Sequence, residues 1–479
     1  MKKDGELKTD EYVIKNLNRK DQLYYGKVIL NVLTSASRNK NLIGTSFIFG
    51  GEKYMKRRIV NIANYKKPAR ISFFVGTMLS LIICSSCLTD SIDLNNAKTD
   101  STRIEKTEQT TAANLTQTTN EIALKTSTQT ADANLTQTTE NATNSVKPYD
   151  DIRYIPPIMP KQVYDENEYN KNDIITYTFN QGTILKGNEE LQAQVMENGK
   201  NPGLGIRKLH DKGITGKGVN VAIIDQNLLL DHPEFAGKIA AYYDTGCEQD
   251  ENSSSMHAPA VTSILVGNTI GVAPDAKVYF AAAPSWKTDS EFYAKGLNWI
   301  IEENKKLPVD EKIRVVSVSA APSGVGSPFT KNQYMWDEAV LAAQKERILV
   351  LDCNSIIYPA YYDPTDPDDV SKCKGGFPKS EYPYLPHVIQ ITHIGVPCSY
   401  RTVAEEYRKG EFSYQYTGQG GLSWGIPYAA GVLALGWQVN PSLDKDKIVQ
   451  ILFDTCTKAN DGSNIINPVA FIDAVEKTK

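Results

Sequence analysis

The sequence lacks several features that would assign it to common classes of protein. Its 479 residues carry a net charge of −4, so the basic surplus typical of a general nucleic-acid binder is missing. No two CxxC motifs occur together, which argues against a zinc ribbon, and seven cysteines imply no disulfide framework, although one or two bridges stay open. No GxGxxG or GxxxxGKS/T motif follows a candidate strand, which disfavours nucleotide binding.

The N-terminal region has only a short apolar run, and its surroundings are those of a targeting signal. Residues 55–70 are basic and contain no acid, and the mostly apolar residues 71–84 are too few for an ordinary spanning helix. Such a pair of segments is typical of a secretory signal. Small residues then precede Cys87, and this ending resembles a bacterial lipobox, in which Cys87 would be lipidated. We therefore expect the protein to be exported and attached to the cell-envelope membrane through a lipid on Cys87. In the alternative, residues 55–87 are not cleaved and act as a signal anchor.

Residues 1–54 stand in front of this signal, where a secretory protein should have no further segment. The codons of Gly50–Glu52 can spell a purine-rich ribosome-binding sequence shortly before Met55. We expect translation to start at Met55 and residues 1–54 to be a non-native or disordered extension. A real cytoplasmic extension is the alternative.

The next two segments are not expected to form domains of their own. Residues 88–152 are dominated by Thr, Asn, Ala, Ser and Gln, and so offer too little apolar area to offset the entropy lost on ordering. We expect a disordered tether there. Residues 153–200 contain one candidate strand (174–179) and one candidate helix (189–196). They are either an N-terminal extension draped on the following domain or the remnant of a propeptide.

Residues 201–479 alternate apolar runs of strand length with helical stretches. The runs are nearly continuous in apolar residues, as a sheet covered on both faces requires. They are residues 219–225, 277–283, 313–320, 348–354 and 387–394. The expected helices are residues 257–266, 290–305, 333–346 and 443–453, and a last helix that opens with Asn467 as N-cap and Pro468 at its first position. This alternation predicts an α/β fold: a doubly wound, mostly parallel sheet with helices on both faces.

Chemistry in such folds collects at the carboxyl ends of the strands. Asp225 ends the first strand and Asn354 ends the fourth, while His257 begins a helix and a Gly-rich turn leads to Ser423. A carboxylate, an amide, an imidazole and a hydroxyl are the groups that acyl transfer needs. Each residue alone could be a cap or a turn residue, but the combination favours catalysis.

Three separated stretches carry a family resemblance. They read GKGVNVAIIDQN with DHPEF (216–235), SMHAPAVTSILVGNTIGVAPDAKVYF (255–280) and GLSWGIPYAAGVLAL (421–435). In this order they resemble the subtilisin-like serine peptidases, or subtilases, over about residues 203–477. The resemblance implies their fold and a serine endopeptidase activity on polypeptides.

The resemblance also implies a role for each candidate residue. Ser423 would be the nucleophile, His257 its general base, and Asp225 the group that orients the imidazole. Asn354 and the backbone N–H of Ser423 would stabilise the oxyanion. Ser319, Ala320 and Ala321 match the strand that pairs with the substrate backbone.

Departures from the family pattern concern neighbours of these residues. Gln226, Pro259 and Trp424 replace the usual residues beside the triad, and Cys353 replaces the glycine before the oxyanion asparagine. An alternative function is therefore a weakly active or inactive subtilase-fold surface protein that binds peptides or protein partners. Cys353 and Cys373 could pair or stay free.

No cofactor is expected to be required. A turn-rich insertion after Asn354 carries Asp363, Asp366, Asp368 and Asp369, which makes structural calcium an alternative to a plain solvated loop. We expect a monomer whose partners are a polypeptide substrate and, through its N-terminal segment, a membrane, with no nucleic acid.

Overall fold

The computed structural model describes residues 145–154, 162–248, 252–324, 326–379 and 393–479. The predictions on residues 1–144, among them the start at Met55, lipidation of Cys87 and the tether, lie outside the described residues, and the proposed domain boundaries stay predictions. In the part of the chain that is described, no helix is long and apolar enough to cross a membrane.

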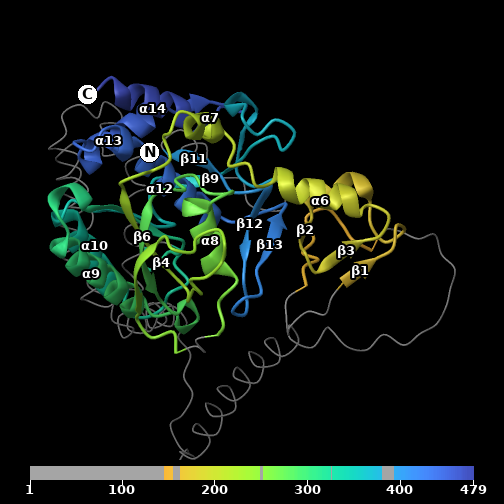
Figure 1. The fold of residues 1–479 in the computed structure, drawn as a ribbon, viewed down its shortest axis with the longest axis horizontal. Helices are drawn as coiled ribbons and strands as arrows, with labels where there is room; N and C mark the ends of the chain where they lie inside the picture. The colour runs from red at the N-terminus through yellow and green to blue at the C-terminus, as the bar shows by residue number, and fades with distance from the viewer. Residues whose placement is uncertain (1–144, 155–161, 249–251, 325, 380–392) are drawn as a thin grey trace, which may run out of the picture. The chain divides into compact units, whose positions relative to one another are not determined.

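The centre of the described structure is a parallel sheet with the strand order β5-β6-β4-β7-β8 (Figure 1). Its strands are β4 (Asn220–Asp225), β5 (Ile239–Asp244), β6 (Lys277–Ala282), β7 (Ile313–Val318) and β8 (Leu349–Leu351). Strands β5 and β6 lie on one side of β4, and strands β7 and β8 lie on the other. The direction in which the chain adds strands therefore reverses at β4, and the predicted doubly wound fold is confirmed. Strand β5 was not expected from the sequence, because its side chains are largely exposed and form no continuous apolar run.

Helices cover this sheet on both faces. Along β4, Val221 and Ile223 join the core that also contains residues of α8 (His257–Val266) and α12 (Leu422–Val439). Ala222 and Ile224 join a second core formed with α9 (Ser290–Lys306) and α10 (Gln333–Lys345). Because successive side chains of a strand point to opposite faces, both faces of β4 must be apolar, which explains its uninterrupted run.

The predicted helices agree with the structure to within two residues. Besides those named above, the helices are α6 (Glu189–Asn198), α7 (Ile206–Asp211), α13 (Lys445–Asp454) and α14 (Pro468–Glu476), with single 3-10 turns η3 (Ser285–Lys287), η4 (Val309–Glu311) and η5 (Val370–Lys372). The Asn467 side chain accepts a hydrogen bond from the N–H of Ala470 at 3.0 Å, so the predicted N-cap is confirmed.

The fourth predicted strand is wrong at its end, and most of the fifth is not tested. β8 ends at Leu351 rather than at 354, because the Asp352 side chain accepts from the N–H of Asn354 (3.0 Å) and its carbonyl from that of Ser355 (3.0 Å), which forms a turn. Most of the strand predicted at 387–394 lies outside the described residues.

A second sheet follows with the order β10-β9-β11-β15-β14. Its strands are β9 (Ile357–Tyr361), β10 (Lys374–Gly375), β11 (Ile394–Pro397), β14 (Thr457–Lys458) and β15 (Asn464–Ile465).

The N-terminal extension joins the domain through a third sheet. Here β2 (Thr178–Asn180) pairs antiparallel with β13 (Ser413–Thr417), which pairs with β12 (Arg401–Glu405) (Figure 1). The strand predicted at 174–179 is wrong in its first half, which belongs to the 3-10 helix η2 (Lys171–Thr176). The side chain of Asn170 accepts from the N–H of Asn172 at 3.1 Å and so caps this turn. The extension also contains β1 (Gln162–Tyr164) and β3 (Thr183–Leu185).

Gly418 marks the place where the extension touches the loop that leads into α12. Its N–H donates to the carbonyl of Tyr177 at 3.1 Å. A Cβ added at Gly418 would lie only 1.9 Å from the carbonyl oxygen of Thr176. Because backbone atoms of η2 cannot move aside as a flexible side chain could, this position requires glycine.

We expect Gly418→Ala to lower the free energy of unfolding by about 2–3 kcal/mol, because the new methyl group separates the extension from the loop. The measurement is urea unfolding followed by tryptophan fluorescence. Gly421→Ala is the matched control, since its φ is −113° and the nearest atom to an added Cβ is 3.9 Å away. Equal losses in the two variants would contradict this account of Gly418.

Candidate active site

A buried carboxylate and an imidazole meet at the carboxyl end of the central strand. Asp225 is the last residue of β4 and His257 the first residue of α8, and the Nδ1 of His257 lies 2.7 Å from the Oδ1 of Asp225. The Asp225 side chain is 3% exposed, whereas that of His257 keeps 21%. The imidazole is therefore bonded to the protein through Nδ1, while part of the side chain stays exposed to solvent.

The first turn of α8 fixes the position of His257. The hydroxyl oxygen of Ser255 accepts from the N–H of Ala258 at 3.0 Å, which satisfies one of the free donors at the helix start. Pro259 is tolerated in this turn because the N–H groups of a first helical turn have no acceptor within the helix. The N–H that proline lacks is therefore not needed at this position. The departure from the family pattern at Pro259 thus fits the local structure.

The charge environment favours the protonated form of His257. Burial alone lowers the pKa of the imidazole, but the negative charge of Asp225 and the hydrogen bond to it outweigh burial, and the pKa lies above its ordinary 6.5. An imidazolium formed during a reaction would be stabilised by the same pair.

Ser423 lies at the start of α12, beside this pair. It is the second residue of the helix, and α12 packs against α8. The indole of the following residue, Trp424, has its centroid 5.3 Å from that of the His257 ring. The Ser423 hydroxyl donates to the carbonyl of Ser319 at 3.2 Å, and no hydrogen bond among the described residues joins it to His257. The structure thus brings Asp225 and His257 into direct contact and turns Ser423 toward the end of β7.

A proline in α12 explains a second bond between Ser423 and Ser319. Pro427 has no N–H, so the carbonyl of Ser423, four residues earlier, lacks its usual partner in the helix. The hydroxyl of Ser319 donates to that carbonyl at 2.8 Å. Two reciprocal hydrogen bonds therefore join the end of β7 to the first turn of α12.

Several known proteins are similar to this chain in sequence. Residues 216–353 match the model of the subtilase family. M-protease of Shouchella clausii is 26% identical over 279 residues, which cover 54% of this chain and 66% of that protein, or just under two thirds of its length. Subtilisin Savinase of Lederbergia lenta is 26% identical over 279 residues, 54% of this chain and 93% of that protein. Serine protease AprX of Bacillus subtilis is 25% identical over 289 residues, 52% of this chain and 63% of that protein. Over residues 216–353 the chain is similar to the subtilase family.

The residues expected to contact substrate form hydrogen bonds within the protein itself. The Asn354 side chain is exposed and its amide nitrogen donates to the carbonyl of Ser323. The carbonyl of Ala320 accepts from the N–H of Cys353 at 2.9 Å, and that of Ala321 from the hydroxyl of Ser327 at 2.6 Å. Their roles in oxyanion and substrate binding stay predictions.

The cysteines of the described residues are all free thiols, so Cys353 and Cys373 are not bridged. Burial raises the pKa of the Cys353 thiol well above its ordinary value of 9. The thiol therefore stays protonated and is not a nucleophile.

The carboxylates of the insertion after β8 bond within the protein. In the part of the chain that the structure describes, no three His, Cys, Asp or Glu side chains gather as metal ligands, and calcium binding stays a prediction. The partners are Thr365 for Asp363, Lys372 for Asp366, the N–H of Gly205 for Asp368, and Ser371 for Asp369.

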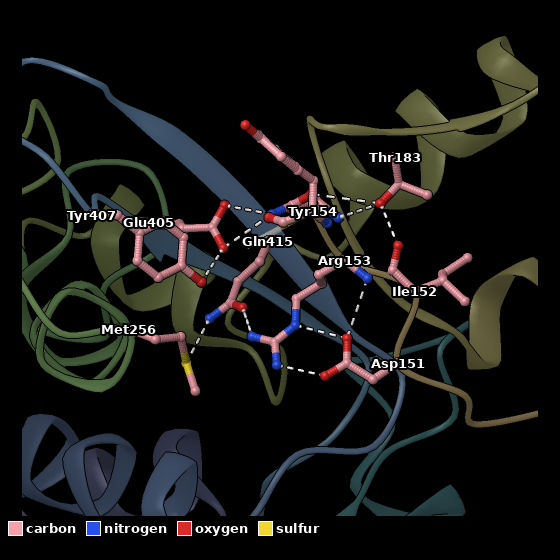
Figure 2. Close-up of polar contacts among 10 residues, drawn as sticks. Asp151, Ile152, Arg153, Tyr154, Thr183, Met256, Glu405, Tyr407 and Gln415 are labelled. Atoms are coloured by element: carbon pink, nitrogen blue, oxygen red, sulfur yellow. Dashed lines mark hydrogen bonds and ion pairs between the residues drawn. The ribbon is translucent and has the colours of Figure 1, made fainter. Parts of the chain in front are cut away.

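Some residues that border the site could not be singled out by sequence analysis. Met256, next to His257, accepts a hydrogen bond at its sulfur from Gln415 at 3.4 Å, and Gln415 in turn accepts from Arg153 of the extension (Figure 2). Arg153 lies more than 100 residues before His257, and no motif connects them. Trp424 was visible only as a departure from the family pattern.

We expect Ser319→Ala to destabilise the protein by about 1–3 kcal/mol, because the partly buried Ser423 carbonyl loses its only side-chain donor among the described residues. Pro427→Ala restores a backbone N–H that can bond to that carbonyl, so Ser319→Ala should cost less in the Pro427→Ala background. A double-mutant cycle of denaturant unfolding measures the difference. Equal costs in both backgrounds would show that Pro427 has no part in the pairing.

Proposed function

We propose that this protein is a subtilase, a serine endopeptidase that hydrolyses peptide bonds through an acyl-enzyme, with Ser423 as nucleophile, His257 as general base and Asp225 as its orienting acid. The observation that carries the proposal is the 2.7 Å contact between the Nδ1 of His257 and the buried carboxylate of Asp225. An Nδ1–H donated to the carboxylate leaves the lone pair of Nε2 to accept a proton.

One side-chain rotation would complete the site. The Ser423 hydroxyl would turn from the carbonyl of Ser319 to the Nε2 of His257. The same rotation would free the Ser319 carbonyl to accept an N–H of the substrate backbone. Ser423 keeps its place during this change, because its own carbonyl is still held by the Ser319 hydroxyl.

The chemical steps then follow from the placement of these groups. The Ser423 oxygen attacks the peptide carbonyl while His257 takes the hydroxyl proton, and Asp225 stabilises the imidazolium. The N–H of Ser423, at the start of α12, and the side chain of Asn354 stabilise the oxyanion. His257 returns the proton to the leaving amine, and water hydrolyses the acyl-enzyme in the reverse sense.

The proposal extends to where the enzyme acts. The basic and apolar segments at residues 55–87 support export and membrane attachment, either by lipidation of Cys87 or by a signal anchor. The substrate is then a polypeptide outside the cytoplasm, and the reaction itself requires no cofactor.

A second candidate function rests on the observed hydroxyl position. If Ser423 stays bonded to Ser319 in solution, the molecule is a subtilase-fold protein that binds peptides without cleaving them. The two functions differ in whether Ser423 can be acylated.

We expect a fluorophosphonate probe to label the wild-type protein and not the Ser423→Ala variant, because only an activated serine attacks the probe. His257→Ala should lower the labelling rate by at least about 10³-fold. Labelling is measured by gel fluorescence and by mass on the peptide that contains Ser423. Ser327→Ala, which alters another hydroxyl near the site, is the control and should label normally. A wild-type protein that is folded yet unlabelled would favour the binding function.

The labelling rate of the wild type should fall as the pH drops through a pKa above 6.5, because His257 must be neutral to take the proton and Asp225 raises its pKa. Replacing Asp225 with Asn removes that charge, so the acid limb should move to lower pH while the rate drops by up to about 10⁴-fold. Rates measured between pH 5 and 9 test both effects. An acid limb that stays in place in the Asp225→Asn variant would rule out the proposed coupling.

A further inference from the structure

The indole of Trp424 lies beside the imidazole of His257. Trp424 directly follows Ser423 in α12 and is only 6% exposed. Its ring centroid is 5.3 Å from that of the His257 ring, and the two ring planes meet at 54°. An aromatic ring attracts a cation that lies within about 6 Å of its centroid, and tryptophan does so most strongly. The indole is therefore close enough to act on His257 as soon as the imidazole takes up a proton.

Contacts on the side of the N-terminal extension fix the indole in place. Its Nε1–H donates to the hydroxyl of Thr417 at 3.2 Å. Thr417 lies on β13 opposite Thr178 of β2, so the strand of the extension supports this acceptor. A Cβ added at Gly420 would lie 2.9 Å from the Cδ1 of Trp424, which shows that the loop before α12 packs directly on the ring. An indole held by a hydrogen bond and by packing has little freedom to turn away from His257.

Asp225 and Trp424 hold the imidazole in different ways. Asp225 is the charged group that acts on the ring, and it binds Nδ1 at 2.7 Å. A single hydrogen bond leaves a ring free to tilt about that bond, and a second ring packed beside it restricts the tilt. Together the two contacts fix the direction of Nε2. This direction matters because Nε2 must meet the Ser423 hydroxyl in the proposed reaction.

We propose that Trp424 is a positioning residue for the general base: its ring holds the imidazole of His257 in place and stabilises the imidazolium that forms when Ser423 loses its proton. This inference rests on the proposed peptidase function and adds a residue that acts through His257. The proton passes from the Ser423 oxygen to Nε2 and then to the leaving amine, so the indole itself makes and breaks no bond.

The indole has two effects on the pKa of His257, and they have opposite signs. Its π electrons stabilise the imidazolium and so raise the pKa. Its bulk keeps water from the ring, which disfavours the charged form and lowers the pKa. Leucine keeps much of the apolar bulk but has no π electrons, whereas phenylalanine keeps an aromatic ring. The direction of the pKa change in Trp424→Leu therefore shows which of the two effects is larger.

The pKa of His257 is measured by NMR titration of the full chain with isotope-labelled histidine, and its signal is identified by its loss in His257→Gln. We expect Trp424→Leu to lower this pKa by about 0.4–0.7 units and Trp424→Phe to lower it by less than half as much. At alkaline pH the fluorophosphonate labelling rate of Trp424→Leu should fall by about 3–10-fold. The acid limb of that rate should move to lower pH together with the NMR value.

Trp437→Leu is the matched control. Trp437 lies on the same helix, about 20 Å farther along it, and is 2% exposed. Its indole N–H donates to the carbonyl of Leu443 at 3.0 Å. This variant therefore loses a buried indole and its hydrogen bond, as Trp424→Leu does, but far from His257. We expect it to destabilise the fold and to leave the pKa of His257 unchanged.

A His257 pKa that stays constant or rises in Trp424→Leu would overturn the inference, because the indole would then only shield the ring from water. An equal fall in Trp437→Leu, or in Trp424→Phe, would also overturn it. The proposed function fails in a different way, namely when the folded wild type is not labelled by the probe at all. The NMR titration needs no acylation, so the two failures can be told apart.

Discussion

The burial of Asp225 at the end of β4 is the constraint on which the site depends. Because helices cover both faces of β4, the strand must be apolar up to its last residue, and the carboxylate there has almost no contact with water. A buried charge of this kind is costly unless it is paired. His257 supplies the partner, so the packing of the core and the orientation of the imidazole are consequences of the same arrangement.

A different set of hydrogen bonds holds the region around Ser423. Pro427 deprives the first turn of α12 of one helical hydrogen bond, and Ser319 replaces it from the end of β7. The carboxyl end of the sheet and the start of α12 are thereby joined through backbone carbonyls and hydroxyls. Because the backbone of Ser423 is fixed in this way, its hydroxyl is the part that can rotate, and the proposed function requires such a rotation.

The N-terminal extension belongs structurally to the same region. Its strand β2 pairs with β13, and its turn η2 lies against Gly418, five residues before Ser423. Arg153 reaches the neighbour of His257 through Gln415. Removing a segment with these contacts would expose β13 as an edge strand, so the extension and the proposed catalytic residues are best regarded as one folded unit.

Sequence periodicity determines the central strands and the helices on both faces, because these elements depend on local patterns. Motif order determines the candidate residues Asp225, His257, Asn354 and Ser423, because they end a strand or begin a helix. They do not determine strand β5, strands β12 and β13, or the turn at η2, whose side chains are exposed or whose partners lie far along the chain. Only the tertiary structure decides that Asp225 and His257 touch, that Ser423 faces Ser319, and that Arg153 lies beside the site. The reason is physical: a hydrogen bond between residues separated by tens to hundreds of positions depends on how whole elements pack, and no local pattern records it.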